Sequence, residues 1–229
     1  MYHHFEDPVS SDVSCTPQDF ESHMIALKKA GFTFLNVETA RFFLLGSGKE
    51  IKKPILVTFD DGYESNYLHA FPVALKLKIP LTVFVITSRI GLKPQFTKYL
   101  SEDQIKEMAL SGLIDFGSHT HDLHTKTLTI FRAFRSNPNP VLRLLSQDLQ
   151  QSKKRLFEIT GKEVISLAWP YGNYNSQISK IAFDCGFLLH FTSRNGYNEP
   201  GSDPFGIKRI PITSRDNVES VLRKARGGN

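Results

Sequence analysis

Reactive side chains in this sequence gather directly after runs that are typical of buried strands. Two adjacent carboxylates, Asp60 and Asp61, follow the apolar run 55–59 and precede a glycine. Successive residues that leave a strand point in different directions, so one carboxylate can bind a cation while the other accepts a proton from a bound water. Asp-Gly is also common in solvated turns, and for the dipeptide alone the turn is the stronger interpretation.

Histidines follow a second run of this kind, residues 114–117. His119 and His124 are five residues apart, with His121 between them. Two imidazoles and one carboxylate with open coordination positions suit a zinc, iron, cobalt or nickel ion that keeps a water molecule. A histidine-rich surface loop is the alternative, but two carboxylates at a neighbouring strand end favour a metal site.

Alternating strands and helices would bring these groups together. Strands are predicted at Tyr2 and at residues 33–37, 55–59, 81–86, 114–117, 164–169, 187–192 and 207–212. Helices are predicted at residues 17–30, 65–78, 101–112, 141–161, 176–185 and 216–225. Strands separated by helices indicate a parallel sheet, and seven or eight such units in one domain indicate a distorted α/β barrel. Active sites of such barrels lie at the carboxyl ends of the strands, where both clusters fall.

Composition excludes several classes of protein. The chain has 229 residues, of which 40% are hydrophobic and 22% charged, and no apolar run approaches the roughly 18 residues of a membrane span. The net charge of +5 comes from short, scattered basic groups rather than one dense stripe, so nucleic acid is not an expected partner. The first residues have neither a basic nor an apolar region, and no signal peptide is expected in this chain.

Three motifs, in order along the chain, resemble the polysaccharide deacetylases of carbohydrate esterase family 4. They are residues Thr58–Tyr63, Ser118–His124 and Trp169–Gly172. The opening Tyr2-His3, the histidine spacing and the Trp-Pro-Tyr-Gly sequence resemble most the biofilm poly-β-1,6-N-acetylglucosamine deacetylases. The resemblance implies that residues 1–229 form one deacetylase domain, that the substrate is an N-acetylglucosamine polymer, and that the protein works outside the cell or at its surface. We expect a monomer.

The resemblance also implies a role for each reactive residue. Asp60 would be the general base. A divalent metal ion, zinc in the first place and nickel, cobalt or iron as alternatives, would be held by Asp61, His119 and His124. The ion would lower the pKa of a water molecule, and Asp60 would take the proton of that water as it attacks the acetyl carbonyl.

Two further roles concern the oxyanion and the leaving amine. The backbone N–H of Tyr171 would help to hold the oxyanion. An amine leaves poorly unless it is protonated, and the resemblance assigns the general acid to His3. His190, in a Leu-x-His sequence, is the weaker candidate for the acid, and a structural role in a strand is the preferred interpretation of it.

The sequence departs from the family at one position and leaves the sugar contacts open. Many members carry an arginine two residues before the proline of the third motif, where this chain has Ala168. Arg209 is a candidate for the missing basic partner of Asp60, and a surface role is an equal alternative. The candidates for contact with the sugar are Trp169, Pro170, Tyr63 and Arg209. Core packing is an equal interpretation of Trp169, and helix packing of Tyr63.

Two other functions stay open. Peptidoglycan, chitin oligomers or xylan would be the substrate if the active site is the same but the glycan differs. A catalytically silent carbohydrate-binding domain would keep the barrel without the reaction. The second is the weaker, because every position for the metal and the base is filled.

Overall fold

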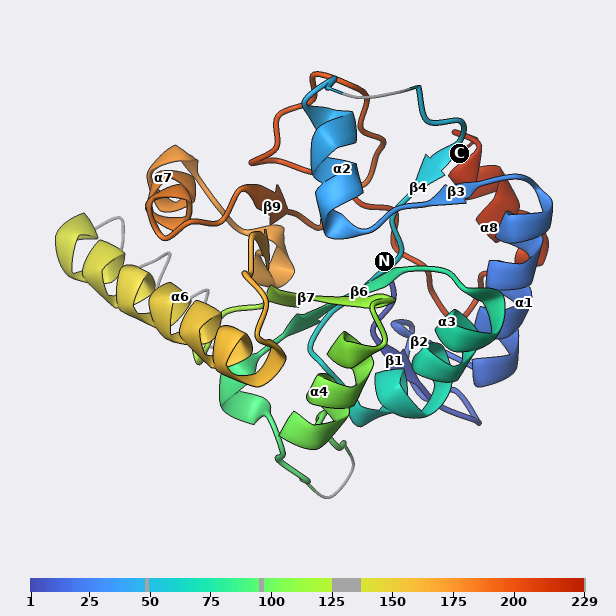
Figure 1. Ribbon diagram of the computed structural model, residues 1–229, viewed down its shortest axis with the longest axis horizontal. Coiled ribbons are helices and arrows are strands. Elements are labelled where there is room, and N and C mark those ends of the chain that lie inside the picture. Colours follow the sequence, from blue (N-terminus) through green and yellow to red (C-terminus); the bar gives the residue numbers. More distant parts are fainter. Residues whose placement is uncertain (48–49, 95–96, 125–136, 229) are drawn as a thin grey trace.

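Five parallel strands form the central sheet of the computed structural model (Figure 1). The structure describes residues 1–47, 50–94, 97–124 and 137–228. The strands lie side by side in chain order: β5 (Thr58–Phe59), β6 (Leu81–Val85), β7 (Ile114–Ser118), β8 (Ser166–Ala168) and β9 (Leu189–Phe191). All five residues of β6 are buried, as expected for a strand that is covered on both faces.

Two short segments join the edges of this sheet. Tyr2 forms a parallel bridge with Phe59 at one edge, and Ile207 forms one with Phe191 at the other. The segment that follows Ile207 then reaches the first residue, because Met1 N donates to Ile210 O (2.9 Å) and Ile212 N donates to Met1 O (2.9 Å). Seven strand segments thus form a ring, which confirms the expected distorted α/β barrel.

Two predicted strands were wrong in their extent. The run 55–59 is divided, because β4 (Pro54–Ile55) pairs with β3 (Thr33–Phe34) outside the barrel and only β5 belongs to the central sheet. The run 33–37 ends early, because Val37 is already the first residue of helix α2 (Val37–Leu44). Asn36 caps that helix by accepting a hydrogen bond from Thr39 N at 2.8 Å. A further pair, β1 (His4–Phe5) and β2 (Ser14–Cys15), lies beside the ring.

Helices cover the outside of the strands (Figure 1). The α-helices are α1 (Pro17–Lys29), α2, α3 (Phe71–Leu77), α4 (Glu102–Leu110), α6 (Pro138–Thr160), α7 (Ser176–Asp184) and α8 (Val218–Ala225). Short turns of other helix types are η1 (Asn66–Ala70), η2 (Thr87–Arg89) and η3 (Pro170–Gly172). Ser101 and Gln104 form the predicted capping box of α4. None of the helices in the described ranges is long and apolar enough to cross a membrane.

An aromatic cluster holds the end of β5, the strand that leads to the two aspartates. Phe59 is fully buried, and its ring centroid lies 5.4 Å from that of Phe20 in α1 and 5.6 Å from that of Tyr2. Aromatic side chains bury large apolar areas and pack in defined geometries. Phe59, the residue before Asp60, is therefore held in place by aromatic side chains of the core.

Gly117 tests how tightly the barrel is packed beside the site. A Cβ at this position would lie 2.5 Å from ring atoms of Phe84 and 2.5 Å from Ser166 Oγ. We therefore expect Gly117→Ala to lower the free energy of unfolding by about 1–3 kcal/mol, as measured by urea denaturation. An unchanged midpoint would show that β6, β7 and β8 have more room than the structure indicates.

Candidate active site

The backbone takes an uncommon conformation where β5, β7 and β8 end. Asp61 (φ 73°), Thr120 (φ 70°) and Tyr171 (φ 56°) each have a positive φ, although none is a glycine. Such conformations cost free energy in residues with a side chain and are concentrated at functional sites. Gly62 continues the turn after Asp61 with φ 76°, and a Cβ there would lie 3.1 Å from Val85 Cγ1. The chain thus turns sharply at the carboxyl edge of the barrel, where the reactive residues were predicted.

Asp61, His119 and His124 form a cluster with the donor set of a metal site. Asp61 Oδ1 lies 3.2 Å from His124 Nε2 and 3.6 Å from His119 Nε2, and the ligand atoms of the three residues lie within 4.8 Å of one another. Asp61 Oδ1 is buried and has no hydrogen-bond partner among the described residues. One carboxylate and two imidazoles that converge in this way fit a zinc-like divalent ion with positions left for water.

The tautomer of His119 is set by the neighbouring strand. His119 Nδ1 lies 2.7 Å from the carbonyl oxygen of Ala168 in β8, which can only accept, so Nδ1 carries the proton. Nε2 is then a lone-pair donor that faces Asp61. Burial lowers the pKa of His119, which favours the neutral form that binds metals. A carbonyl partner of this kind orients an imidazole ligand.

Asp61 is held as a carboxylate. Burial works to raise its pKa, but the facing imidazole of His124 and the electrostatic effect of the His119 ring outweigh burial and lower the pKa below the usual value. Asp61 is 9% exposed and His119 is 3% exposed. Asp61 and His119 are therefore buried, and the shifts of their pKa values favour the carboxylate and the neutral imidazole that bind a metal ion.

Asp60 forms a buried ion pair with Arg209. Arg209 Nη1 donates to Asp60 Oδ1 at 2.6 Å and Nη2 donates to Oδ2 at 2.7 Å, while Nε donates to Thr192 O at 2.9 Å. Both side chains are buried, at 3% and 6% exposed. Burial alone would raise the pKa of Asp60, but the guanidinium charge lowers it well below the usual range. Asp60 is therefore a carboxylate at every physiological pH.

The pair with Arg209 supplies the basic partner that was expected to be missing at Ala168. Ala168 is fully buried in β8 and contributes its carbonyl oxygen to His119 instead. Arg209 belongs instead to the last segment of the ring, which follows Ile207. Its contact with the sugar, the other expectation for this residue, stays a prediction.

His3 lies next to Asp60 on the segment that precedes β1. The backbone brings His3 to Asp60, because Asp60 N donates to the carbonyl oxygen of Tyr2, the residue before His3, at 3.1 Å. Asn66 Nδ2 donates to the carbonyl oxygen of His3 at 2.9 Å and fixes its backbone. His3 Nδ1 is buried and has no hydrogen-bond partner in the described part of the chain. The backbone of His3 is thus fixed close to Asp60, and its Nδ1 is left without a hydrogen-bond partner among the described residues.

His190 has a structural environment. Its ring is fully buried, with Nδ1 2.9 Å from Ser179 Oγ and Nε2 3.2 Å from Phe187 O. Burial lowers its pKa to about 4. Both ring nitrogens are occupied within the core, which supports the interpretation of His190 as a strand histidine.

The third motif brings Tyr171 over the cluster. Tyr171 is 62% exposed, and its ring centroid lies 5.1 Å from that of His124. Trp169 is buried, and its ring packs edge-on against His190 at 5.7 Å. Pro170 is buried as well. Tyr171 is therefore the residue of this motif that faces solvent, and the sugar contacts predicted for Trp169 and Pro170 stay predictions.

Tyr63 lies in a row of rings beside Asp61. Its ring centroid is 4.8 Å from that of His4 and 5.3 Å from that of Tyr99. Burial and the Asp61 carboxylate raise the pKa of Tyr63, so its hydroxyl stays protonated. The sequence assigned His4 only a structural role. Its Nδ1 lies 2.8 Å from Ser65 Oγ, so it helps to fix this wall of the site.

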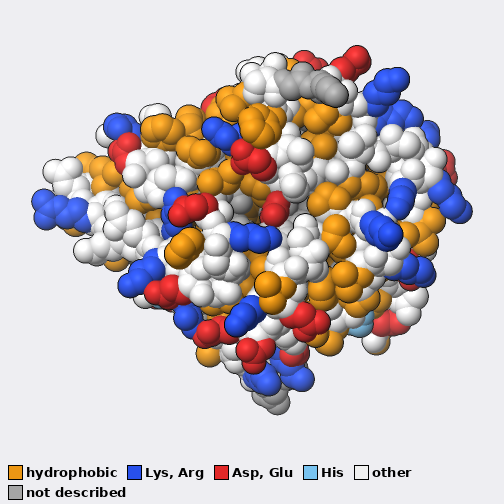
Figure 2. All heavy atoms as spheres, in the orientation of Figure 1, with side chains coloured by type: hydrophobic (Ala, Val, Ile, Leu, Met, Phe, Trp, Pro, Cys, Tyr) orange, Lys and Arg blue, Asp and Glu red, His pale blue; other side chains and the backbone are white. Residues whose placement is uncertain are grey.

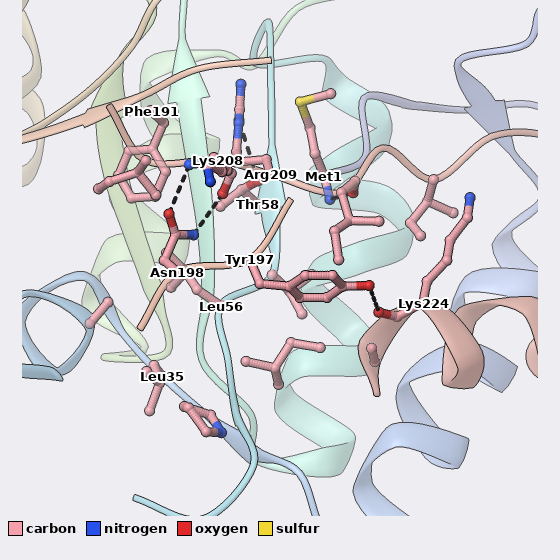
Figure 3. Close-up of a pocket in the computed structure, with 18 of the residues that line it drawn as sticks. Met1, Leu35, Leu56, Thr58, Phe191, Tyr197, Asn198, Lys208, Arg209 and Lys224 are labelled. Carbon is pink, nitrogen blue, oxygen red and sulfur yellow. Dashed lines mark hydrogen bonds between the residues drawn. The ribbon is translucent and has the colours of Figure 1, made fainter. Parts of the chain in front are cut away.

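A cavity of about 220 Å³ is lined in part by Arg209, the partner of Asp60 (Figure 3). Its lining is mostly apolar and includes Leu35, Leu56, Phe191 and Tyr197, but none of the metal cluster. The reactive cluster therefore lies apart from this cavity.

The surface charge is mixed. On the face shown in Figure 2, basic side chains are interspersed with acidic ones.

Comparisons with known proteins agree with this arrangement. Residues 47–190 match the sequence profile described as polysaccharide deacetylase. The chain is 33% identical over 212 residues to a poly-beta-1,6-N-acetyl-D-glucosamine N-deacetylase from Staphylococcus epidermidis, covering 92% of this chain and 72% of that protein. It is 30% identical over 217 residues to a protein of the same name from Staphylococcus aureus, covering 92% and 71%.

Solved structures show the same fold. IcaB from Ammonifex degensii superposes with a TM-score of 0.84 at 32% identity, covering 99% of this chain and 95% of that one. The polysaccharide deacetylase BC0361 from Bacillus cereus superposes with a TM-score of 0.79 at 28% identity, covering 98% and 67%. Both likenesses extend over nearly the whole of this chain.

The ion pair predicts a stability difference that depends on pH. Arg209→Met leaves the Asp60 carboxylate buried without its partner, and we expect the free energy of unfolding at pH 7 to fall by about 3–5 kcal/mol. The pKa of Asp60 rises in this variant, so acid protonates the group and relieves the penalty. In the wild type the depressed pKa keeps Asp60 ionised, so its ion pair with Arg209 continues to stabilise the protein until a lower pH is reached. Urea denaturation should therefore show that the difference in unfolding free energy between the wild type and Arg209→Met becomes smaller from pH 7 to about pH 4.

The double variant Asp60→Asn/Arg209→Met provides the control, and should recover most of the loss. The ion pair between Asp60 and Arg209 would be contradicted if Arg209→Met lost the same unfolding free energy at both pH values. It would also be contradicted if the double variant were as unstable as Arg209→Met.

The cluster predicts one divalent ion per chain. Titration calorimetry with Zn²⁺ should give a single site, and Asp61→Ala or His119→Ala should each weaken binding by about 100-fold or more, because each removes one of three protein ligands. Asp184→Ala removes an exposed carboxylate that pairs with Lys180 on α7, and serves as the control. Equal affinity in all four proteins would place the ion elsewhere.

Proposed function

This chain belongs to the polysaccharide deacetylase family, and from that premise we propose that it removes N-acetyl groups from poly-β-1,6-N-acetylglucosamine in a metal-dependent hydrolysis. We further propose that residues 1–229 act as one deacetylase domain, and that the protein meets its polymer outside the cell or at its surface. The observation that carries the mechanism is the pairing of two adjacent carboxylates with different partners. Asp61 faces two imidazoles, and Asp60 faces a guanidinium.

The two carboxylates have separate tasks. Asp61, His119 and His124 would hold the ion, zinc in the first place. When bound, a divalent ion supplies charge stabilisation and lowers the pKa of a water molecule toward neutrality. Asp60 would accept the proton of that water as its oxygen attacks the acetyl carbonyl carbon. Arg209 holds both oxygens of Asp60, which orients the carboxylate and keeps it ionised before the substrate arrives.

Two groups would act on the acyl centre and the leaving amine. The backbone N–H of Tyr171 would stabilise the oxyanion of the tetrahedral intermediate. His3 would donate a proton to the nitrogen as the C–N bond breaks, because an amine leaves poorly as an anion. Acetate and a glucosamine unit would be released. The position of His3 beside Asp60 supports this assignment, since the acid and the base then act on the same bound acetamide.

The substrate is proposed from the relatives. Two of them, at 33% and 30% identity, are named for the β-1,6-linked polymer. The exposed ring of Tyr171 on one side and the ring of Tyr63 on the other would border the bound sugar. Peptidoglycan, chitin oligomers and xylan remain the alternatives within the same chemistry. A silent carbohydrate-binding domain is the alternative from another class.

Acetate release from defined oligomers tests the proposal. We expect release from β-1,6-linked N-acetylglucosamine oligomers to exceed release from β-1,4-linked ones and to stop with a chelator. Release from the β-1,4 oligomers alone would keep the reaction and overturn the proposed substrate. Glycan binding that a chelator leaves unchanged, with no acetate released from either, would favour the silent domain.

The identity of the acid is tested in the same assay. His3→Gln should lower kcat by about 10²–10⁴-fold while Zn²⁺ affinity stays unchanged, because His3 moves a proton and is not a metal ligand. His190→Gln is the matched control, since its ring is bonded within the core. It should lower thermal stability and leave kcat within a few-fold of the wild type. The reverse pattern would assign the acid to His190.

A further inference from the structure

The loop that carries both histidine ligands is held by a buried carboxylate from helix α6. Asp148 Oδ1 accepts a hydrogen bond from His121 N at 2.7 Å, and Oδ2 accepts one from Asp122 N at 2.7 Å. Asp148 is only 6% exposed. Both oxygens of one side chain thus bind two successive backbone amides that lie between His119 and His124.

Other contacts tie the start of the same loop to its neighbours. Ser152, one turn further along α6, has its Oγ 2.6 Å from Ser118 Oγ, and Ser118 Oγ also accepts from Thr120 N at 3.0 Å. On the other side of the loop, Thr87 N donates to Thr120 O at 3.2 Å and Ser88 N donates to His121 O at 3.1 Å. Asp148 is the group that continues this attachment towards His124.

A charged group at this position needs a reason. Burial raises the pKa of Asp148, and the two amide hydrogen bonds offset part of that effect. Packing α6 against the loop does not require a carboxylate, and a buried charge costs free energy. A carboxylate does provide two acceptor atoms in one rigid plane, whereas an amide side chain of the same shape provides one acceptor and one donor.

We propose that Asp148 is a positioning residue for the metal site, which fixes the backbone at residues 121–122 and thereby sets the place of His124 relative to His119 and Asp61. The inference rests on the proposed metal site. A ligand that must sit within about 0.5 Å of its productive place depends on such supporting contacts. Asp148 touches neither the ion nor the substrate, and acts through the loop alone.

Asp148→Asn tests this role, with Asp115→Asn as the matched control. Asp115 is also a carboxylate whose pKa burial raises and that accepts a backbone N–H, from Val37 at 2.8 Å, but it lies at the opposite end of β7. Competition with a chromophoric chelator should show Zn²⁺ affinity about 10–100-fold weaker in Asp148→Asn and unchanged in Asp115→Asn. The visible spectrum of bound Co²⁺ should change in the first variant only. Both variants should lower the thermal stability of the metal-free protein.

Equal Zn²⁺ affinity in wild type and Asp148→Asn would overturn the inference, whereas no Zn²⁺ binding by the wild type would overturn the proposed metal site itself. A second measurement uses the unaltered chain in case Asp148→Asn does not fold. In the metal-free wild type, the amides of His121 and Asp122 should exchange with solvent slowly, as hydrogen-bonded groups do. Fast exchange that slows only when Zn²⁺ is added would show that the ion, and not Asp148, orders the loop.

Discussion

The buried ion pair between Asp60 and Arg209 is the interaction on which the rest of the site depends. It joins the end of β5 to the last segment of the ring, so the contact that helps to close the barrel also holds the proposed base. Two charges taken out of water are stable only when their geometry is good, and here both oxygens of the carboxylate are used. A proposed base with a depressed pKa is a weak proton acceptor, but it is ionised over the whole physiological pH range.

The cluster of Asp61, His119 and His124 depends on a second constraint, which is the direction in which the side chains point after each strand ends. The turns at Asp61, Thr120 and Tyr171 all have a left-handed backbone, and Thr87 N holds the second of them by donating to Thr120 O. The Ala168 carbonyl fixes His119, α6 fixes the loop that leads to His124, and Val85 crowds the place that a Cβ at Gly62 would take. Neighbouring elements of the barrel therefore position the loops that carry the cluster.

Much of this could be predicted from the sequence, because the motifs stand where apolar runs end. The barrel, the Asp-His-His cluster and its rim position all followed from that pattern. The divided run 55–59 could not be seen, since both halves are apolar and only pairing with β3 separates them. Helix α2 had a signal in the cap formed by Asn36 and Thr39. The sequence contains no signal for the role of Asp148, because an acidic residue on a long amphipathic helix is typical of a solvated side chain. Its partners are known only from the folded structure.

The central claim is that the two adjacent aspartates divide their work, with Asp61 on the ion and Asp60 on Arg209. Anomalous diffraction from crystals grown with Zn²⁺ tests it most directly. The account predicts one strong peak about 2.0–2.2 Å from a carboxylate oxygen of Asp61 and from Nε2 of His119 and His124, with Asp60 still paired to Arg209. A peak coordinated by Asp60, with Arg209 released, or a zinc ion bound away from this cluster, would contradict it.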